Sequence, residues 1–160
     1  TIYTCGPTVS NFSHLGNCRS FIFADVLRRY LKYKGYKVKQ VRNLTDVDDK
    51  TIKGSIQEHV SLREFTEKYT NLFFEDMNTL NVEGIEYNPR ATDNINEMVQ
   101  LIKKLMERGY AYKTDDGIYF KISKFKNYGK LAHLDMKGLK SGATVKTDEY
   151  DKENIQENTL

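Results

Sequence analysis

Three residue types are absent or scarce in the sequence. It has no tryptophan, two prolines and two cysteines among 160 residues. The two thiols, Cys5 and Cys18, are too few for a dense disulfide framework, so we expect a reducing compartment. The chain also lacks any run of eighteen apolar residues. The sequence therefore predicts no membrane-spanning helix and no membrane partner.

The residues that are present have the balance of an ordinary globular protein. Apolar residues make up 39% of the chain and charged residues 29%, with a net charge of +3. A length of 160 residues suits one domain or one large piece of a bigger protein. A net charge this small does not by itself indicate a nucleic-acid partner.

One stretch departs from this balance in its local charge. Residues 26–44 contain seven basic residues and no acidic one: Arg28, Arg29, Lys32, Lys34, Lys37, Lys39 and Arg42. Two interpretations stay open. The stretch is either a surface that faces the phosphates of an RNA, or a solvated helix face followed by a basic turn, which we favour.

The order of the predicted elements indicates an α/β fold. Residues 1–5 read as a short buried strand, residues 15–34 as a helix that ends at Gly35, and residues 36–44 as an alternating strand. Apolar residues follow helical spacing in the helix: Phe23, Leu27, Tyr30 and Leu31. Strand, crossover helix and strand within about forty residues predict a parallel unit of an α/β sheet.

Two more helices and a hairpin are predicted after this unit. A capping box of Ser61 and Glu64 begins one helix, and Gly109 ends the other. Their apolar faces comprise Phe65, Tyr69, Leu72 and Phe73 in the first helix and Ile95, Met98, Ile102 and Met106 in the second. Residues 110–122 are typical of a hairpin, and the polar segment from Lys146 of a loop or frayed end.

The carboxyl ends of the two strands predict a ligand site, because ligands bind at these ends in parallel α/β sheets. Cys5 and Gly6 follow the first strand, and residues 43–46 follow the second. We therefore expect Cys5 and Thr45 to lie within the reach of one amino acid.

The start of the helix at residue 15 predicts a place for phosphate, because a helix N-terminus has unpaired N–H groups and partial positive charge. His14 can donate a hydrogen bond to a phosphate oxygen, Gly16 lets a flat base lie on the backbone, and Asn17 supplies an amide. On its own this pattern is more often structural. It has neither P-loop nor dinucleotide spacing.

Several stretches together resemble the cysteinyl-tRNA synthetase family of class I aminoacyl-tRNA synthetases. They are YTCGPTVSNFSHLGN, DVLRRYLKYKGYKV, RNLTDVDDKTIK, NPRATDNI and YGKL, in this order along the chain. The resemblance implies the Rossmann-like parallel sheet of a synthetase catalytic domain in residues 1–60. It also implies an inserted helical and β-hairpin connective segment in residues 61–140, followed by a loop or frayed end in residues 141–160.

The resemblance also implies an activity: ATP-dependent activation of L-cysteine, with ATP bound to Mg²⁺, and transfer of the cysteine to tRNA(Cys). PTVSNFSHLGN corresponds to the HIGH signature of the family. By this resemblance, His14 is catalytic; Thr8, His14, Gly16 and Asn17 bind ATP; Gly6 and Thr45 bind cysteine; Cys5 is a zinc ligand; and Lys50 and Lys53 belong to a basic signature.

Some parts of the family pattern have no counterpart in this sequence. The further Cys, His and Glu ligands of zinc, the KMSKS loop and the anticodon-binding domain do not map, so the resemblance implies an incomplete part of the enzyme. We expect Cys18 to pack within its helix, and His59 and His133 to lie at the surface. The expected compartment is the cytoplasm, with an organelle as the alternative.

Two other functions remain as alternatives. One is the related ligase that joins cysteine to an amino-sugar pseudodisaccharide. The other is a non-catalytic truncated paralogue that binds RNA or a protein partner through the basic stretch of residues 28–42. The sequence predicts no particular oligomeric state.

Overall fold

The computed structural model describes residues 1–115 and 117–134. The chain divides into two compact units, an amino-terminal unit of Thr1–Ile95 and a carboxy-terminal unit of Asn96–Leu160. The predicted loop from residue 141 onward lies outside the described residues. Among the described helices, none is both long and apolar enough to cross a membrane.

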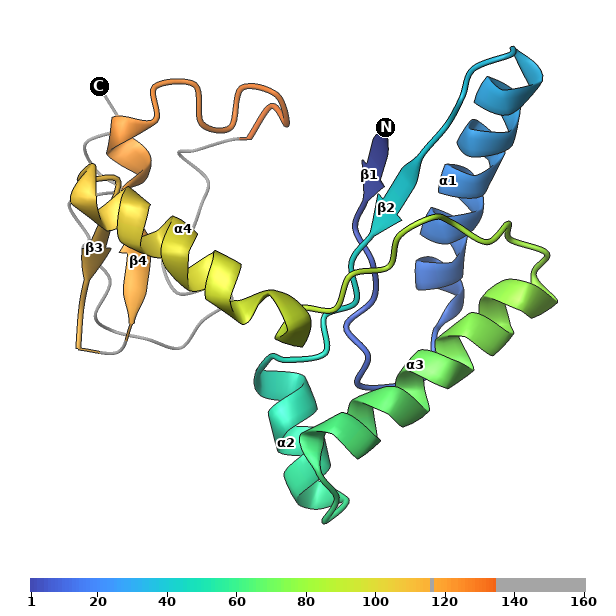
Figure 1. Cartoon of the computed structure of the whole chain (residues 1–160), viewed down its shortest axis with the longest axis horizontal. Coiled ribbons are helices and arrows are strands. Elements are labelled where there is room, and N and C mark those ends of the chain that lie inside the picture. The colour runs from blue at the N-terminus through green and yellow to red at the C-terminus, as the bar shows by residue number, and fades with distance from the viewer. Residues whose placement is uncertain (116, 135–160) are drawn as a thin grey trace. The chain divides into compact units, whose positions relative to one another are not determined.

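The amino-terminal unit is built on two parallel strands joined by a helix. Strands β1 (Ile2–Thr4) and β2 (Gln40–Arg42) lie side by side, and α1 (Leu15–Tyr33) connects them (Figure 1). Ile2 pairs with Gln40. The predicted parallel unit is thus confirmed, but β2 covers only Gln40–Arg42 of the expected residues 36–44.

Isolated bridges extend this small sheet. A parallel bridge between Thr8 and Thr45 continues the pairing of the first two strands beyond their ends. On the other side of β2, Val41 and Leu44 form parallel bridges with Tyr87 and Arg90. A parallel sheet is therefore present in part, as one regular pair flanked by single bridges.

Helix α1 begins and ends where the sequence predicts, but its predicted apolar residues are not the ones that are buried. Gly35 follows the helix with a φ of +86°, the left-handed conformation that glycine tolerates best. Phe23, Leu27 and Tyr30 are exposed. The described structure buries three other residues of this helix: Phe21, Asp25 and Arg28.

The apolar core lies between α1, the strand ends and α3 (Leu62–Thr79). Its buried residues are Val9, Phe21, Leu44, Phe65, Tyr69, Phe73 and Met77. The expected apolar face of α3 is thus confirmed, with Leu72 partly buried against it. Aromatic rings meet edge to face in this core: the centroids of Phe21 and Phe73 lie 5.0 Å apart.

Helix α2 (Asp49–Gln57) was not predicted. Its N-cap, Asp48, accepts a hydrogen bond from the backbone N–H of Thr51, and the Thr51 hydroxyl accepts one from the backbone N–H of Asp48. The helix packs on α3 so closely that a Cβ on Gly54 would lie 2.3 Å from the ring of Phe65. His59 follows α2 with a φ of 56° and is exposed, as expected for a surface histidine.

The remaining elements confirm the second predicted helix and the hairpin. A short 3₁₀ helix, η1 (Thr92–Asn94), precedes α4 (Ile95–Glu107), and Gly109 follows with a φ of +70°. Strands β3 (Ala111–Lys113) and β4 (Ile118–Phe120) pair antiparallel, and η2 (Ile122–Lys124) comes next.

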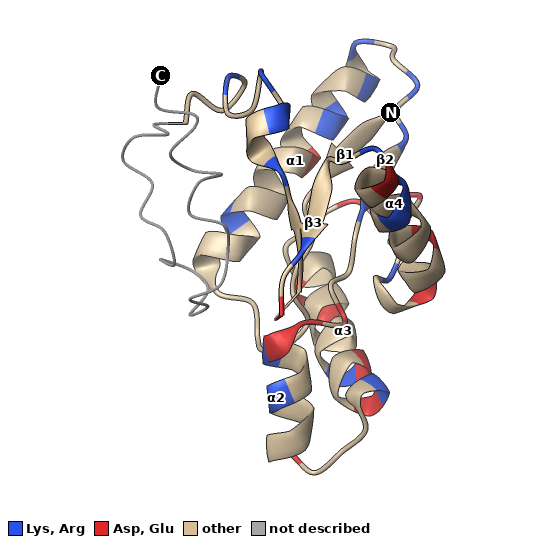
Figure 2. Cartoon of the chain, turned by 90° about the vertical axis from the view of Figure 1, so that its left-hand side faces the viewer, with Lys and Arg blue, Asp and Glu red and all other residues tan. Residues whose placement is uncertain are grey.

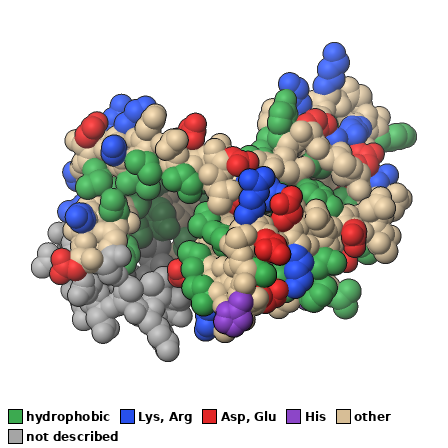
Figure 3. Space-filling model, turned by 60° about the horizontal axis from the view of Figure 1, so that its bottom comes forward, with side chains coloured by type: hydrophobic (Ala, Val, Ile, Leu, Met, Phe, Trp, Pro, Cys, Tyr) green, Lys and Arg blue, Asp and Glu red, His purple; other side chains and the backbone are tan. Residues whose placement is uncertain are grey.

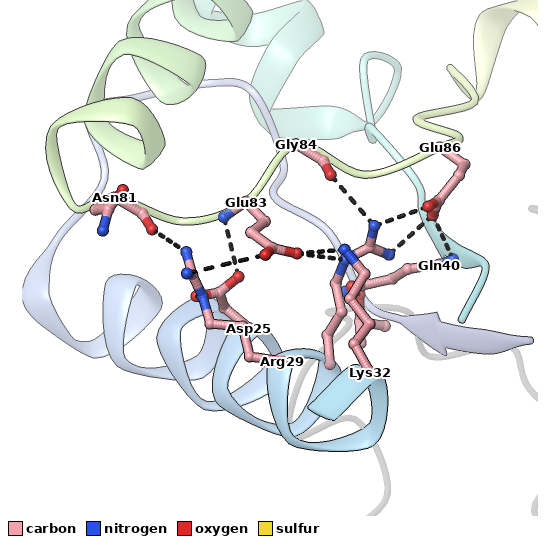
Figure 4. A network of polar contacts seen from close by, with 10 residues as sticks. Asp25, Arg29, Lys32, Gln40, Asn81, Glu83, Gly84 and Glu86 are labelled. Atoms are coloured by element: carbon pink, nitrogen blue, oxygen red, sulfur yellow. Dashed lines mark hydrogen bonds and ion pairs between the residues drawn. The ribbon is translucent and has the colours of Figure 1, made fainter. Parts of the chain in front are cut away.

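An ionic network centred on the buried Arg28 joins α1 to the segment after α3 (Figure 4). We call it the Arg28 network; its members are Arg28, Lys32, Glu83 and Glu86. Arg28 is 3% exposed and donates hydrogen bonds to Glu86 at 2.7 and 2.8 Å and to Glu83 at 3.2 Å. The hydrogen bonds from Arg28 and from the backbone N–H of Gln40 lower the pKa of Glu86. Lys32 donates to Glu83 at 2.6 Å.

A second buried cation, Arg42, is held by aromatic rings. Its guanidinium lies 4.8 Å from the ring centroid of Phe73 and 5.5 Å from that of Phe21. Its Nε donates to the side chain of Asn88. Burial lowers the pKa of Arg42. Among the described residues no carboxylate pairs with it.

These contacts bear on both interpretations of the basic stretch. Basic residues follow α1 and the loop after it (Figure 2), yet four of the seven bind within the unit: Arg28, Arg29, Lys32 and Arg42. On the face drawn in Figure 3, basic and acidic side chains are interspersed. The stretch therefore serves largely to hold the unit together, which weakens the interpretation of a phosphate-facing surface.

Candidate active site

The carboxyl ends of β1 and β2 lie side by side. The backbone N–H of Thr45 donates to the carbonyl of Pro7 at 3.0 Å, and the carbonyl of Thr45 accepts from Val9 at 3.1 Å. The approach is so close that a Cβ on Gly6 would lie 1.6 Å from the backbone oxygen of Asn43. Glycine is therefore required where the two strand ends meet.

His14 is the N-cap of α1 and forms a capping box with Asn17. Its Nδ1 accepts a hydrogen bond from the backbone N–H of Asn17 at 3.3 Å, and the Asn17 side chain accepts one from the backbone N–H of His14 at 3.4 Å. Because Nδ1 is an acceptor, the proton of a neutral ring must sit on Nε2. The exposed ring of His14 thus presents an N–H donor away from the helix.

Gly16 is close to this ring. A Cβ on Gly16 would lie 3.0 Å from both Cε1 and Nδ1 of His14. Contacts as short as this require the ring to move by a few tenths of an ångström. The absence of a side chain at Gly16 therefore leaves the space that the ring of His14 occupies.

A hollow of about 390 Å³ brings together several predicted site residues. Its lining includes Gly6, Thr8, His14, Asn17 and Lys50. The segment between the first strand and α1 supplies most of the remaining wall. Donors from the segment after β1, from the start of α1 and from α2 thus face one space.

Four predicted residues do not line this hollow. Gly16 lines a neighbouring hollow of about 650 Å³, which also includes His14 and Cys18. Lys53 is exposed on α2, one turn after Lys50. Cys5 and Thr45 belong to the strand ends beside the hollow. Cys5 is exposed, and Cys18 packs partly against the core as predicted.

The described residues do not by themselves fit a zinc ion. Among them, no three histidine, cysteine, aspartate or glutamate side chains gather closely enough to hold a metal. Cys5 is exposed at the end of β1, so its thiol is accessible as one ligand. A structural or catalytic zinc ion needs at least three protein ligands.

Sequence reasoning missed contacts that depend on three-dimensional pairing. Asp46 is 2% exposed and accepts hydrogen bonds from the backbone N–H and the hydroxyl of Thr92, at 3.0 and 2.6 Å. This pair ties the end of β2 to the NPRATDNI stretch. The side chain of Asn43, one residue after β2, contacts both strand ends. The position of Asn43 after a strand was the only sequence signal for it.

The chain matches known proteins along its whole length. All residues, 1–160, match the family model described as tRNA synthetases class I (C) catalytic domain. The chain is 51% identical over 160 residues to the cysteine–tRNA ligase of Leptospira interrogans serovar Lai and 48% identical over 160 residues to that of Methanosarcina mazei. Both alignments cover 100% of this chain and 34% of the relative.

A third relative gives the same picture. The cysteine–tRNA ligase of Brachyspira hyodysenteriae is 52% identical over 161 residues, which cover 99% of this chain and 34% of the relative. The chain thus spans about a third of the length of these relatives. Because the family model matches every residue, the chain belongs to the class I (C) tRNA synthetase catalytic-domain family.

Proposed function

We propose that this chain is part of a cysteine–tRNA ligase, which activates L-cysteine with ATP and Mg²⁺ and transfers the cysteine to tRNA(Cys) in the cytoplasm. In this proposal residues 1–60 form the first half of a Rossmann-like catalytic domain. Residues 61–140 form the inserted connective segment. The observation that carries the proposal is the hollow shared by the strand end at Gly6 and the capping histidine of α1.

The first reaction needs positioning and charge stabilisation more than proton transfer. The carboxylate of cysteine is ionised at neutral pH, so it can attack the α-phosphate of ATP without a general base. Negative charge then builds up on the phosphate oxygens as pyrophosphate leaves. His14 donates from Nε2 to one of these oxygens, and the N-terminus of α1 adds its partial positive charge.

The other predicted residues divide between the two substrates. Thr8, Gly16 and Asn17 bind ATP together with His14, and Lys50 contributes positive charge at the edge of the same hollow. Lys53 belongs to the same basic signature. Gly6 and Thr45 bind the amino acid where the strand ends meet.

Cys5 is proposed as one thiolate ligand of zinc, with the other ligands outside the described residues. When bound, zinc would prefer the sulfur of cysteine over the oxygen of serine. A preference of this kind matters because packing alone separates such similar side chains by only about 1–3 kcal/mol. Cys5 is exposed, so its thiol is accessible to a metal ion.

The proposal is tested by cysteine-dependent exchange of pyrophosphate into ATP, with the protein expressed from the intact gene. We expect exchange with cysteine, little with serine, and transfer of labelled cysteine to tRNA(Cys). Transfer to an amino-sugar acceptor without any to tRNA would instead assign the related ligase. Absence of exchange in a folded protein that binds RNA would assign the non-catalytic alternative.

A further inference from the structure

One side-chain amide joins the two strand ends to which we assign cysteine binding. The Oδ1 of Asn43 accepts hydrogen bonds from the backbone N–H of Gly6 at 3.0 Å and from the hydroxyl of Tyr3 at 2.9 Å. Its Nδ2 donates to Oγ1 of Thr45 at 3.0 Å. Asn43 thus contacts both residues that the proposed function assigns to the amino acid.

The contact with Gly6 fixes the direction of the amide. A backbone N–H can only donate, so the oxygen of Asn43 faces Gly6 and the nitrogen faces Thr45. The Thr45 oxygen is therefore an acceptor from Asn43, and its hydroxyl proton is left for another acceptor. Within residues 1–115 and 117–134, no acceptor for this proton is found.

The backbone on both sides is already held without this amide. Thr45 exchanges two backbone hydrogen bonds with the segment of Pro7 and Val9, and Gly6 lies directly against the backbone of Asn43. The amide of Asn43 is only half-buried. The specific contribution of the Asn43 amide is therefore to orient the Thr45 hydroxyl, because other contacts already hold the strand ends in position.

We propose that Asn43 is a positioning residue for the amino-acid substrate. The Nδ2 of Asn43 donates a hydrogen bond to Oγ1 of Thr45. This contact orients the Thr45 hydroxyl, so that the hydroxyl can donate a hydrogen bond to the substrate cysteine. This inference rests on the proposed function, because it requires cysteine to bind at the strand ends.

The variant Asn43→Asp tests the proposal with almost no change of shape. Aspartate keeps an oxygen acceptor for Gly6, but it replaces the donor to Thr45 by a second acceptor, which takes the hydroxyl proton for itself. In the intact gene product we expect the KM for cysteine to rise about 10-fold in the exchange assay, as for the loss of one hydrogen bond. The KM for ATP and the thermal midpoint should stay close to those of the parent. Asn71→Asp, at an exposed position of α3, is the matched control for the added charge.

A double-mutant cycle separates positioning from a general structural effect. In a Thr45→Val background there is no hydroxyl to orient, so Asn43→Asp should change the KM for cysteine by less than about 2-fold. An equal rise in both backgrounds, or a lowered thermal midpoint with a matching rise in the KM for ATP, would show a structural role and overturn the proposal. An active parent whose Asn43→Asp variant keeps the parental KM overturns this inference alone. A folded parent without cysteine-dependent exchange overturns the proposed function, and this inference with it.

Discussion

Two polar clusters of the amino-terminal unit use their hydrogen-bonding groups in opposite ways. In the Arg28 network a guanidinium that is 3% exposed is surrounded by carboxylates of the same chain. In the strand-end cluster, which we define as Cys5, Gly6, His14, Asn43 and Thr45, the thiol and the imidazole are exposed. The Nε2 donor of His14 and the hydroxyl proton of Thr45 point to no acceptor among the described residues.

The difference separates what holds the fold from what remains for a ligand. A buried charge needs compensating partners, such as the carboxylates around Arg28 or the aromatic rings around Arg42, because an uncompensated one costs several kcal/mol. An exposed donor is satisfied by water at little cost, and a ligand can take the place of that water. Substitutions in the Arg28 network should therefore change stability, and substitutions in the strand-end cluster should change activity.

The largest effect is expected for Cys5→Ser in the intact gene product. Loss of a direct zinc ligand should lower both the zinc content and the rate of cysteine-dependent exchange. Loss of a residue that only orients a zinc ligand typically lowers metal affinity or activity about 10–100-fold, and we expect a larger effect here. Metal analysis and exchange kinetics measure the two quantities. Cys18→Ser is the control and should retain zinc, because Cys18 packs against the core. Full zinc content in Cys5→Ser would contradict the ligand assignment. The isolated 160-residue chain, in which Cys5 is the one cysteine assigned to zinc, should hold zinc poorly.

Arg28→Ala should lower the free energy of unfolding by about 2–4 kcal/mol, because it leaves two carboxylates without their shared cation. Denaturant unfolding measures this change. This loss of stability is near the lower end of the range for broken buried ion pairs, because both glutamates are partly exposed. Arg63→Ala removes an arginine that is 89% exposed and should cost less than about 0.5 kcal/mol. Equal free energies of unfolding for Arg28→Ala and Arg63→Ala would show that the Arg28 network does not stabilise the fold.

Acid should weaken the same network. Hydrogen bonds from Lys32 and Arg28 lower the pKa of Glu83, and Arg28 lowers that of Glu86, in both cases from an ordinary value of 4.5. A carboxyl whose pKa is lower in the folded state stabilises the fold above its unfolded pKa and loses this contribution as the pH falls. The thermal midpoint should therefore decrease as the pH drops below about 4.5. In Glu86→Gln this decrease should be shallower. An identical pH profile in the two proteins would contradict the assignment.

Gly16→Ala should have the smallest effect and should move activity and stability in different directions. The new methyl group pushes the ring of His14 by a few tenths of an ångström, so exchange should fall about 3–10-fold, less than the about 100-fold that a displacement of 1 Å can cost. Alanine also favours the helix by up to about 1 kcal/mol, so the thermal midpoint should not fall. A lower midpoint with normal exchange would reverse this interpretation.

The sequence predicted those parts of the fold that depend on neighbouring residues. The glycine after α1 and the apolar face of α3 follow from local patterns, and the parallel pairing of β1 and β2 follows from the order strand, helix, strand. The sequence placed His14 at the start of α1, but it did not predict that His14 caps the helix.

Other parts could not be predicted, because they depend on residues far apart in the chain. The apolar spacing of Phe23, Leu27 and Tyr30 identifies a helix but not the side that this unit buries. The buried side of α1 packs Phe21 against Phe73 and pairs Arg28 with Glu83 and Glu86, all more than fifty positions away. The bridging role of Asn43 likewise depends on how Gly6 and Thr45 pair. Long-range pairing of this kind leaves no periodic signal.

The central claim is that the strand-end cluster serves the reaction while the Arg28 network serves the fold, and His14→Asn tests it most directly. Asparagine is a good N-cap, so α1 keeps its cap and the free energy of unfolding should change by less than about 0.5 kcal/mol. The Nε2 donor is lost, so the kcat of cysteine-dependent exchange in the intact gene product should fall about 10²–10³-fold, with a smaller change in the KM for cysteine. Normal turnover in the folded fraction, together with a much lower thermal midpoint, would contradict the account and make His14 a structural residue.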